Sequence, residues 1–132
     1  MTPRERVFAL LGGKKPDRIP NFNILMAFSA RRNGHTYREY ASDYRILCES
    51  DLACSERYSI DLLCAISDPM REAEGFGANV LLPEDDVPYS PTPLVEDIYE
   101  AEKVLKTYDP YNGGRTEDRL KAVEYFRRNC PD

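Results

Sequence analysis

The sequence predicts an α/β fold in which parallel strands are joined by crossover helices. The main observation is the run at residues 60–66, which is apolar on consecutive positions as in a strand buried on both faces. A second observation is the order of local signals, which read helix, strand, helix, helix, strand and helix along the chain. This alternation is typical of α/β units, so we expect parallel strands covered by helices.

Two capping boxes indicate helix starts in the first half of the chain. Threonine is followed three residues later by glutamate at 2–5 and again at 36–39. The first of these helices should end at Gly12 and present an apolar face that includes Phe8 and Leu11. We also expect a first strand at 20–26, a polar loop at 29–35 and a longer amphipathic helix at 43–58.

The sequence of the second half of the chain predicts further helices and strands, but too few strands for a closed sheet. They are the strand at 60–66, a short helix ending near residue 76, a weaker strand at 79–82, a proline-rich loop, and helices near 95–108 and 116–129. Two strong strands and a weak one cannot cover one another on both faces without open edges. We therefore expect residues 1–132 to form a single partial domain, the first part of a larger barrel or sheet. Such a chain should associate with itself or with a complementary C-terminal chain.

Composition excludes several classes of partner. The chain has 132 residues and a formal net charge of −5, with lysine and arginine scattered, which argues against nucleic acid or an anionic membrane. The sequence has no apolar stretch near the roughly 20 residues of a membrane span and no signal peptide, so we expect a cytoplasmic protein. Four cysteines without metal-binding spacing, and the single histidine His35, predict free thiols, with Cys64 in the core, and no metal site within this chain.

Asp68 is the leading candidate for a functional residue. It follows the apolar run at 60–66, at the end of a predicted parallel strand, where active-site groups collect in α/β folds. Asp68 followed by Pro69 is also a good start for the next helix, so a capping role stays open. If Asp68 faces a ligand, Asp68→Asn should change stability by no more than about 1 kcal/mol and reduce activity about tenfold or more.

Several motifs, in order, resemble the uroporphyrinogen decarboxylase superfamily. They are the N-terminal segments 1–7 and 14–20, the helix start at 34–40, Ser67-Asp68 with residues 72–77, the acidic turn at 83–88, and residues 109–115. The closest resemblance is to its cobalamin-dependent methyltransferases, which pass methyl groups between corrinoids and thiols. The resemblance implies the N-terminal part of a (β/α)8 barrel, with 20–26 and 60–66 as its first two strands and Asp68 as a catalytic residue near Arg31.

The departures from the decarboxylases favour the methyltransferase branch. Decarboxylases carry two arginines after the first strand that hold the acidic side chains of the tetrapyrrole; here Arg31 matches one, and Ala27 replaces the other. Methyltransferases of this branch use zinc and a corrinoid supplied by a partner protein, and their zinc ligands are not in this sequence. We therefore expect part of a methyl-corrinoid:thiol methyltransferase, with uroporphyrinogen decarboxylase and a non-catalytic fragment or binding subunit as alternatives.

Four further residues are candidates for substrate binding. Arg31 and Arg32 follow the first predicted strand, His35 precedes a helix cap, and Tyr89 lies after the acidic turn where it could overhang a pocket. Each has a simpler interpretation: solvated arginines, a histidine in local hydrogen bonds, and one tyrosine among nine. The ligand expected is a tetrapyrrole, or a methyl-corrinoid protein with a small thiol.

Overall fold

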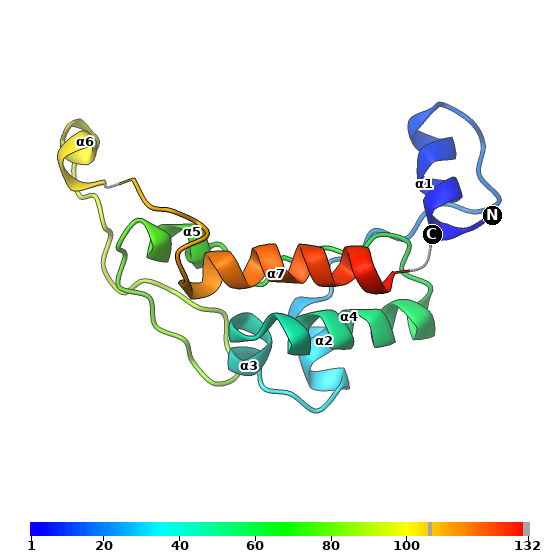
Figure 1. The fold of residues 1–132 in the computed structure, drawn as a ribbon, viewed down its shortest axis with the longest axis horizontal. Coiled ribbons are helices and arrows are strands. Elements are labelled where there is room, and N and C mark those ends of the chain that lie inside the picture. Colours follow the sequence, from blue (N-terminus) through cyan, green and yellow to red (C-terminus); the bar gives the residue numbers. More distant parts are fainter. Residues whose placement is uncertain (106, 131–132) are drawn as a thin grey trace.

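The computed structural model describes residues 1–105 and 107–130, which form seven α-helices and one 3-10 helix. These are α1 (Pro3–Leu11), α2 (Met26–Arg32), α3 (Tyr37–Ser42), α4 (Tyr44–Tyr58), α5 (Met70–Gly75), η1 (Ile98–Glu100), α6 (Ala101–Val104) and α7 (Gly114–Asn129). The two longest helices, α4 and α7, lie side by side, while α1 and α6 project at opposite ends of the molecule (Figure 1). Helices α2 and α3 pack against α4, and α5 packs against α7.

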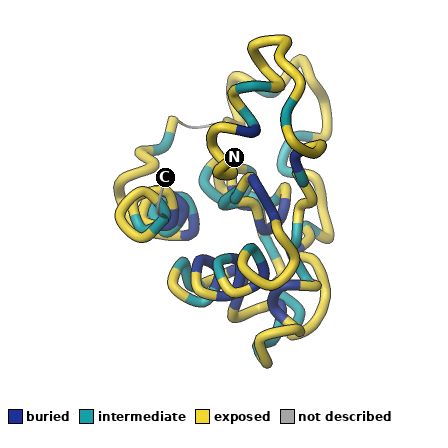
Figure 2. The backbone as a smooth tube through the Cα atoms, turned by 90° about the vertical axis from the view of Figure 1, so that its right-hand side faces the viewer, coloured by how far each residue is buried: buried dark blue, intermediate teal, exposed yellow. Residues whose placement is uncertain are grey.

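The core lies where α2, α3, α4 and α7 meet. Its buried members are Ala30, Tyr37, Tyr40, Leu47, Cys48 and Ala122. The two tyrosines stack with their ring centroids 5.8 Å apart. Buried residues gather where these helices face one another, and most other positions are exposed (Figure 2).

Most of the predicted helix starts are confirmed. Both capping boxes are present, with the Thr2 and Thr36 hydroxyls accepting from the N–H three residues on. The helices expected at 43–58 and 116–129 are α4 and α7, and the short helix before residue 76 is α5. The helix expected near 95–108 is shorter, formed by η1 and α6.

The strands predicted at 20–26 and 60–66 are wrong for the described structure, where both segments run as irregular chain without a β-ladder. The two segments meet through one backbone hydrogen bond, from Asp61 N–H to the Asn21 carbonyl at 2.9 Å. Side chains take the donors that a ladder would need: the Asp61 carboxylate accepts from Asn21 N–H at 2.7 Å, and the Asn21 side chain accepts from Asn23 N–H. At Met26 the chain takes a φ of 43° and enters α2.

Two other local predictions are also corrected. The loop expected at 29–35 is largely helix, because α2 extends to Arg32. The strand expected at 79–82 is reduced, among the described residues, to one antiparallel bridge between Leu81 and Tyr89. The proline-rich sequence that follows limits this pairing, because proline has no N–H to donate.

An ionic network, rather than apolar packing, attaches α1 to the rest of the chain. Its apolar face is exposed, with Phe8 at 61% and Leu11 at 74%, contrary to expectation. Arg6 is buried instead and donates to Asp17 at 2.6 and 2.8 Å and to Asp61 at 2.6 Å. The amphipathic pattern therefore predicted the wrong contact face for α1, because the contact that fixes this helix is ionic.

Two smaller observations complete the fold. Cys64, expected in the core, is only partly buried, because its segment is not enclosed by neighbouring strands. The four cysteines are free thiols. In the described part of the chain, no helix has the length and apolar character needed to cross a membrane.

Candidate functional site

Asp68 lies at the centre of a buried ionic cluster where the segment 60–67 ends. Its side chain is fully buried, and both carboxylate oxygens accept hydrogen bonds. Oδ1 accepts from the Met70 N–H at 3.0 Å, at the start of α5, whose N-cap is Pro69 rather than the predicted Asp68. Oδ2 accepts from the Ser67 hydroxyl at 2.6 Å and from Arg115 at 2.6 Å.

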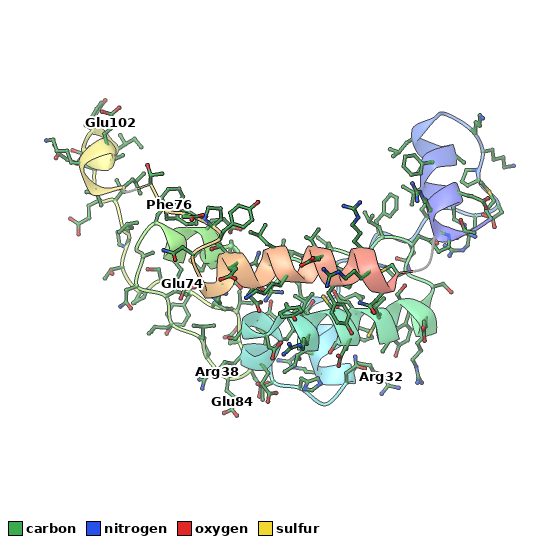
Figure 3. All side chains as sticks on the ribbon, in the orientation of Figure 1. Arg32, Arg38, Glu74, Phe76, Glu84 and Glu102 are labelled. Carbon is green, nitrogen blue, oxygen red and sulfur yellow. The ribbon has the colours of Figure 1, made fainter. Side chains whose placement is uncertain are left out.

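Arg115 bridges two carboxylates from different elements. Its Nη1 donates to Asp68, and its Nε donates to Oε2 of Glu74 on α5 at 2.6 Å. Glu74 lies beside the first turn of α7, where Arg115 is the second helical residue (Figure 3). Gly113 and Gly114 precede it with φ of 85° and 73°, a backbone conformation that glycine adopts without strain. The glycine pair therefore lets α7 start where Arg115 can reach into the cluster.

The surroundings of Asp68 keep it ionised. Burial alone would raise the pKa of its carboxyl group, but the hydrogen bonds from Arg115 and Ser67 and the charge of Arg115 outweigh burial. The net result is an Asp68 pKa below its ordinary value. The carboxylate is thus a fixed negative charge whose two oxygens are both occupied in this structure.

Ser67 connects Asp68 to two further elements. Its carbonyl accepts a hydrogen bond from the Tyr37 hydroxyl on α3, and its own hydroxyl accepts from Nη2 of Arg71 on α5 at 2.6 Å. Burial, and next the charge of Asp68, raise the pKa of Tyr37 to about 12. Tyr37 is therefore a neutral donor near neutral pH, and it holds the end of the segment 60–67 against α3.

The predicted site residues do not gather around Asp68. Asp68 is paired with Arg115 instead of the expected Arg31, whose Nη2 donates to the Asp85 carbonyl at 3.1 Å. Both Arg31 and Arg32 lie on α2 rather than in a loop, and Arg32 Nε donates to the hydroxyl of Tyr58 at 2.9 Å.

The other two candidates have local contacts. His35 Nδ1 lies 3.8 Å from a carboxylate oxygen of Glu39, next to the Thr36 helix cap. Tyr89 is half-exposed and pairs through its backbone with Leu81. The roles in substrate binding proposed for these two and for the α2 arginines stay predictions.

Two surface hollows lie away from the Asp68 cluster. One of about 440 Å³ is lined by Arg32, Asn33, Ala53, Cys54, Glu56 and Arg57. The other, of about 320 Å³, is lined by Asn21, Asn23, Ile24, Leu25, Phe28, Tyr58 and Ile60. The first brings the predicted residue Arg32 to the wall of a hollow, between α2 and the end of α4.

The residues present do not fit a zinc site of the kind that the resemblance implies. Within residues 1–105 and 107–130, no three histidine, cysteine, aspartate or glutamate side chains gather where they could bind a metal ion. Zinc sites in proteins need three or four such ligands. No step of the chemistry is therefore assigned to zinc bound by these residues.

Sequence reasoning missed the arginines of the cluster. Arg71, Arg115 and Arg119 are buried, although arginine is almost never buried without partners. A signal was present in the last helix: Arg115, Arg119 and Ala122 recur at helical spacing and form the buried face of α7. Charged residues at this spacing usually indicate a helix face exposed to solvent. That this face of α7 is buried becomes clear only from the elements packed against it.

The helical fold of the described residues matches part of a larger solved structure. A solved methyltransferase from Methanosarcina mazei is similar over 100% of this chain, with a TM-score of 0.79 and 18% sequence identity. The chain spans 40% of the length of that methyltransferase.

The family is established by sequence. The sequence model of the uroporphyrinogen decarboxylase (URO-D) family matches residues 2–132, so the chain belongs to this family. The resemblance noted in the sequence is thereby confirmed. The comparison with curated proteins gave no match.

Proposed function

We propose that this chain is part of a URO-D family methyltransferase that passes a methyl group from a corrinoid to a thiol. The observation that carries this proposal is the similarity of its whole length to the methyltransferase from Methanosarcina mazei. In the reaction, the methyl group leaves cobalt for sulfur, both electrons of the cobalt–carbon bond stay on cobalt, and the thiol loses its proton.

The residues after the first irregular segment support methyl transfer over decarboxylation. A tetrapyrrole with many carboxylates needs guanidinium groups that converge on it. Ala27 stands where the decarboxylase motif has its first arginine, and the matching Arg31 is exposed and donates to a main-chain carbonyl. The α2 segment therefore offers few of the contacts that a decarboxylase substrate needs.

The Asp68 cluster is the part of the pocket wall that this chain would contribute. Its buried carboxylate and the arginine that pairs with it lock the end of the segment 60–67 to α5 and α7. Such a locked end holds neighbouring groups in a fixed geometry, which is what a transfer between two bound partners requires. Activation of the thiol is left to residues outside this set.

The test is an assay of the complete enzyme with methylcobalamin and 2-mercaptoethanol, and separately with uroporphyrinogen. We expect the absorbance of methylcobalamin to change and the S-methylated thiol to appear by mass spectrometry, with no loss of carboxyl groups from uroporphyrinogen. Decarboxylation without methyl transfer would replace the proposal with the decarboxylase alternative. Activity in neither assay would support a binding role.

A further inference from the structure

Three buried arginines converge between α5 and α7. Arg71, Arg115 and Arg119 are exposed by only 7%, 9% and 6%. The charges of Arg119 and Arg115 both disfavour the cationic form of Arg71. Buried like charges that interact in this way need negative charge nearby to offset their repulsion.

Three carboxylates, those of Asp68, Glu74 and Asp118, lie against these arginines. Arg115 forms ion pairs with Asp68 and Glu74, each at 2.6 Å. Arg119 lies 2.8 Å from the Asp118 carboxylate and donates to the Ala41 carbonyl at 3.0 Å.

Arg71 is the arginine with the weakest partner. It donates to the neutral Ser67 hydroxyl, and its nearest carboxylate, on the exposed Glu72, is 3.7 Å away. Burial, followed by the charge of Arg119, lowers the pKa of Arg71 to about 10. Arg71 therefore remains a cation at neutral pH. The charges of Glu72 and of the buried Asp68 favour this state, but its buried hydrogen bond goes to the neutral Ser67.

The same arginines leave hydrogen-bond donors unused. The buried nitrogens without a partner include Nε of Arg71, Nη2 of Arg115, and both Nε and Nη1 of Arg119. Buried polar groups in proteins almost always have a partner. The cluster has these four unpaired donors against one unpaired acceptor, Oδ2 of Asp118, so further acceptors are missing. An oxyanion is the acceptor that guanidinium groups bind best, because its oxygens match their N–H pairs.

We propose that Arg71 and Arg119, together with the free nitrogen of Arg115, bind the oxyanion group, a carboxylate or a phosphate, of a small ligand. The proposal rests on the proposed function in one respect, because it assigns an anionic end to the substrate that meets the Asp68 cluster. Binding itself is independent of the reaction that follows.

The test titrates the protein with inorganic phosphate and, separately, with acetate, at constant ionic strength set by sodium chloride. Thermal unfolding and the ¹⁵N NMR signals of the arginine Nε groups are recorded. We expect saturable binding that raises the unfolding midpoint and shifts the Nε signals of the buried arginines. Tighter binding of phosphate or of acetate identifies which oxyanion the site takes. The exposed Arg127, on the last turn of α7, provides the matched control as Arg127→Gln.

The Arg71→Gln variant separates a binding site from a structural cluster. Without added anion, this variant should unfold at the same midpoint as the wild type or a higher one, because it removes a buried charge that two neighbouring arginines disfavour. Its affinity for the preferred anion should fall by about tenfold or more, while Arg127→Gln keeps the wild-type affinity. An Arg71→Gln protein that is less stable at every anion concentration, with unchanged anion dependence, would overturn the proposal.

Failure of this inference and failure of the proposed function give different results. If neither anion shifts the midpoint or the Nε signals relative to chloride, internal water fills the donors and the site is refuted, whatever the methyl-transfer assay shows. If an anion binds but no methyl group is transferred, the anion site stands and the proposed reaction does not.

Discussion

Nη1 of Arg115 lies 2.6 Å from Oδ2 of Asp68, and both side chains are buried. The pair joins α7 to the end of the segment 60–67, across 47 positions of sequence. Removing one partner of a buried ion pair leaves an uncompensated charge, which typically destabilises a protein by about 3–5 kcal/mol. The contact therefore organises the candidate site and holds two distant parts of the chain together.

The Asp68→Asn variant should be less stable than the helix-cap interpretation allows. Capping alone predicts a change within about 1 kcal/mol, since asparagine caps nearly as well as aspartate. Loss of the charge opposite Arg115 should instead lower the free energy of unfolding by about 2–3 kcal/mol, less than a full loss because Glu74 still pairs with Arg115. Urea unfolding measures this, and a change below about 1 kcal/mol would show that the pair with Arg115 contributes little to stability.

Activity provides the second measurement on Asp68. In the complete enzyme, we expect Asp68→Asn to lower methyl transfer about tenfold or more, equal to about 1.4 kcal/mol in the transition state. Thr116→Ser, a conservative change on the same turn of α7 as Arg115, provides a control that keeps the cluster. A fully active Asp68→Asn protein would show that the cluster serves only the fold.

Asp51 predicts an unusual dependence of stability on pH. It is buried on α4, and its two carboxylate oxygens lie 3.1 and 3.2 Å from the Tyr40 hydroxyl. Burial raises the pKa of Asp51 to about 6, so the folded state binds this proton more tightly than the unfolded state does.

The contribution of Asp51 to stability is therefore greatest below about pH 4 and is lost as the pH rises to about 6. The loss should amount to at most about 3 kcal/mol. Urea unfolding between pH 4 and pH 8 should show this fall in the wild type and a flatter profile in Asp51→Asn. Identical profiles for the two proteins would contradict the raised pKa.

Asp61 should be more important to stability than Asp17, although both bind Arg6. The side chain of Asp61 is 1% exposed and also accepts from Arg18, whereas that of Asp17 is 44% exposed. Asp61→Asn should lower the free energy of unfolding by about 3 kcal/mol, because it removes the buried counter-charge shared by Arg6 and the more exposed Arg18. Asp17→Asn, the matched control, should change it by no more than about 1 kcal/mol. Equal effects would mean that burial does not set the strength of this network.

Gly75 is required by a close contact rather than by its backbone. A Cβ added at this position would lie 2.7 Å from the ring of Tyr108, which packs edge-on against Phe76. Gly75→Ala should therefore destabilise the protein by about 1–3 kcal/mol through overpacking. Combining it with Tyr108→Ala should cancel that added loss, and thermal unfolding of the four proteins measures the coupling. Additive effects would show that the ring moves aside freely.

Local signals in the sequence predicted the helices well. The boxes at Thr2 and Thr36 cap helices because the interaction that they encode closes within one turn. Likewise, α4 and α7 follow from long amphipathic patterns. Position alone also singled out Asp68, whose carboxylate accepts from the Met70 N–H, although the N-cap of α5 is Pro69 rather than Asp68.

The predictions that failed depend on partners distant in sequence. A strand exists only when a neighbour supplies its ladder, and at residues 21–23 asparagine side chains and the Asp61 carboxylate take those backbone donors. The pairing of Asp68 with Arg115 instead of Arg31 has the same origin, because no local pattern records which arginine reaches a carboxylate 47 positions away.

A double-mutant cycle on Asp68 and Arg115 tests the central claim most directly. The free energy of unfolding in urea is measured for the wild type, Asp68→Asn, Arg115→Gln and the double variant. If the buried pair organises the site, the double variant should be more stable than the sum of the single losses by about 1–3 kcal/mol. Single losses that add to within about 0.5 kcal/mol would show that the two residues act independently and would contradict the account.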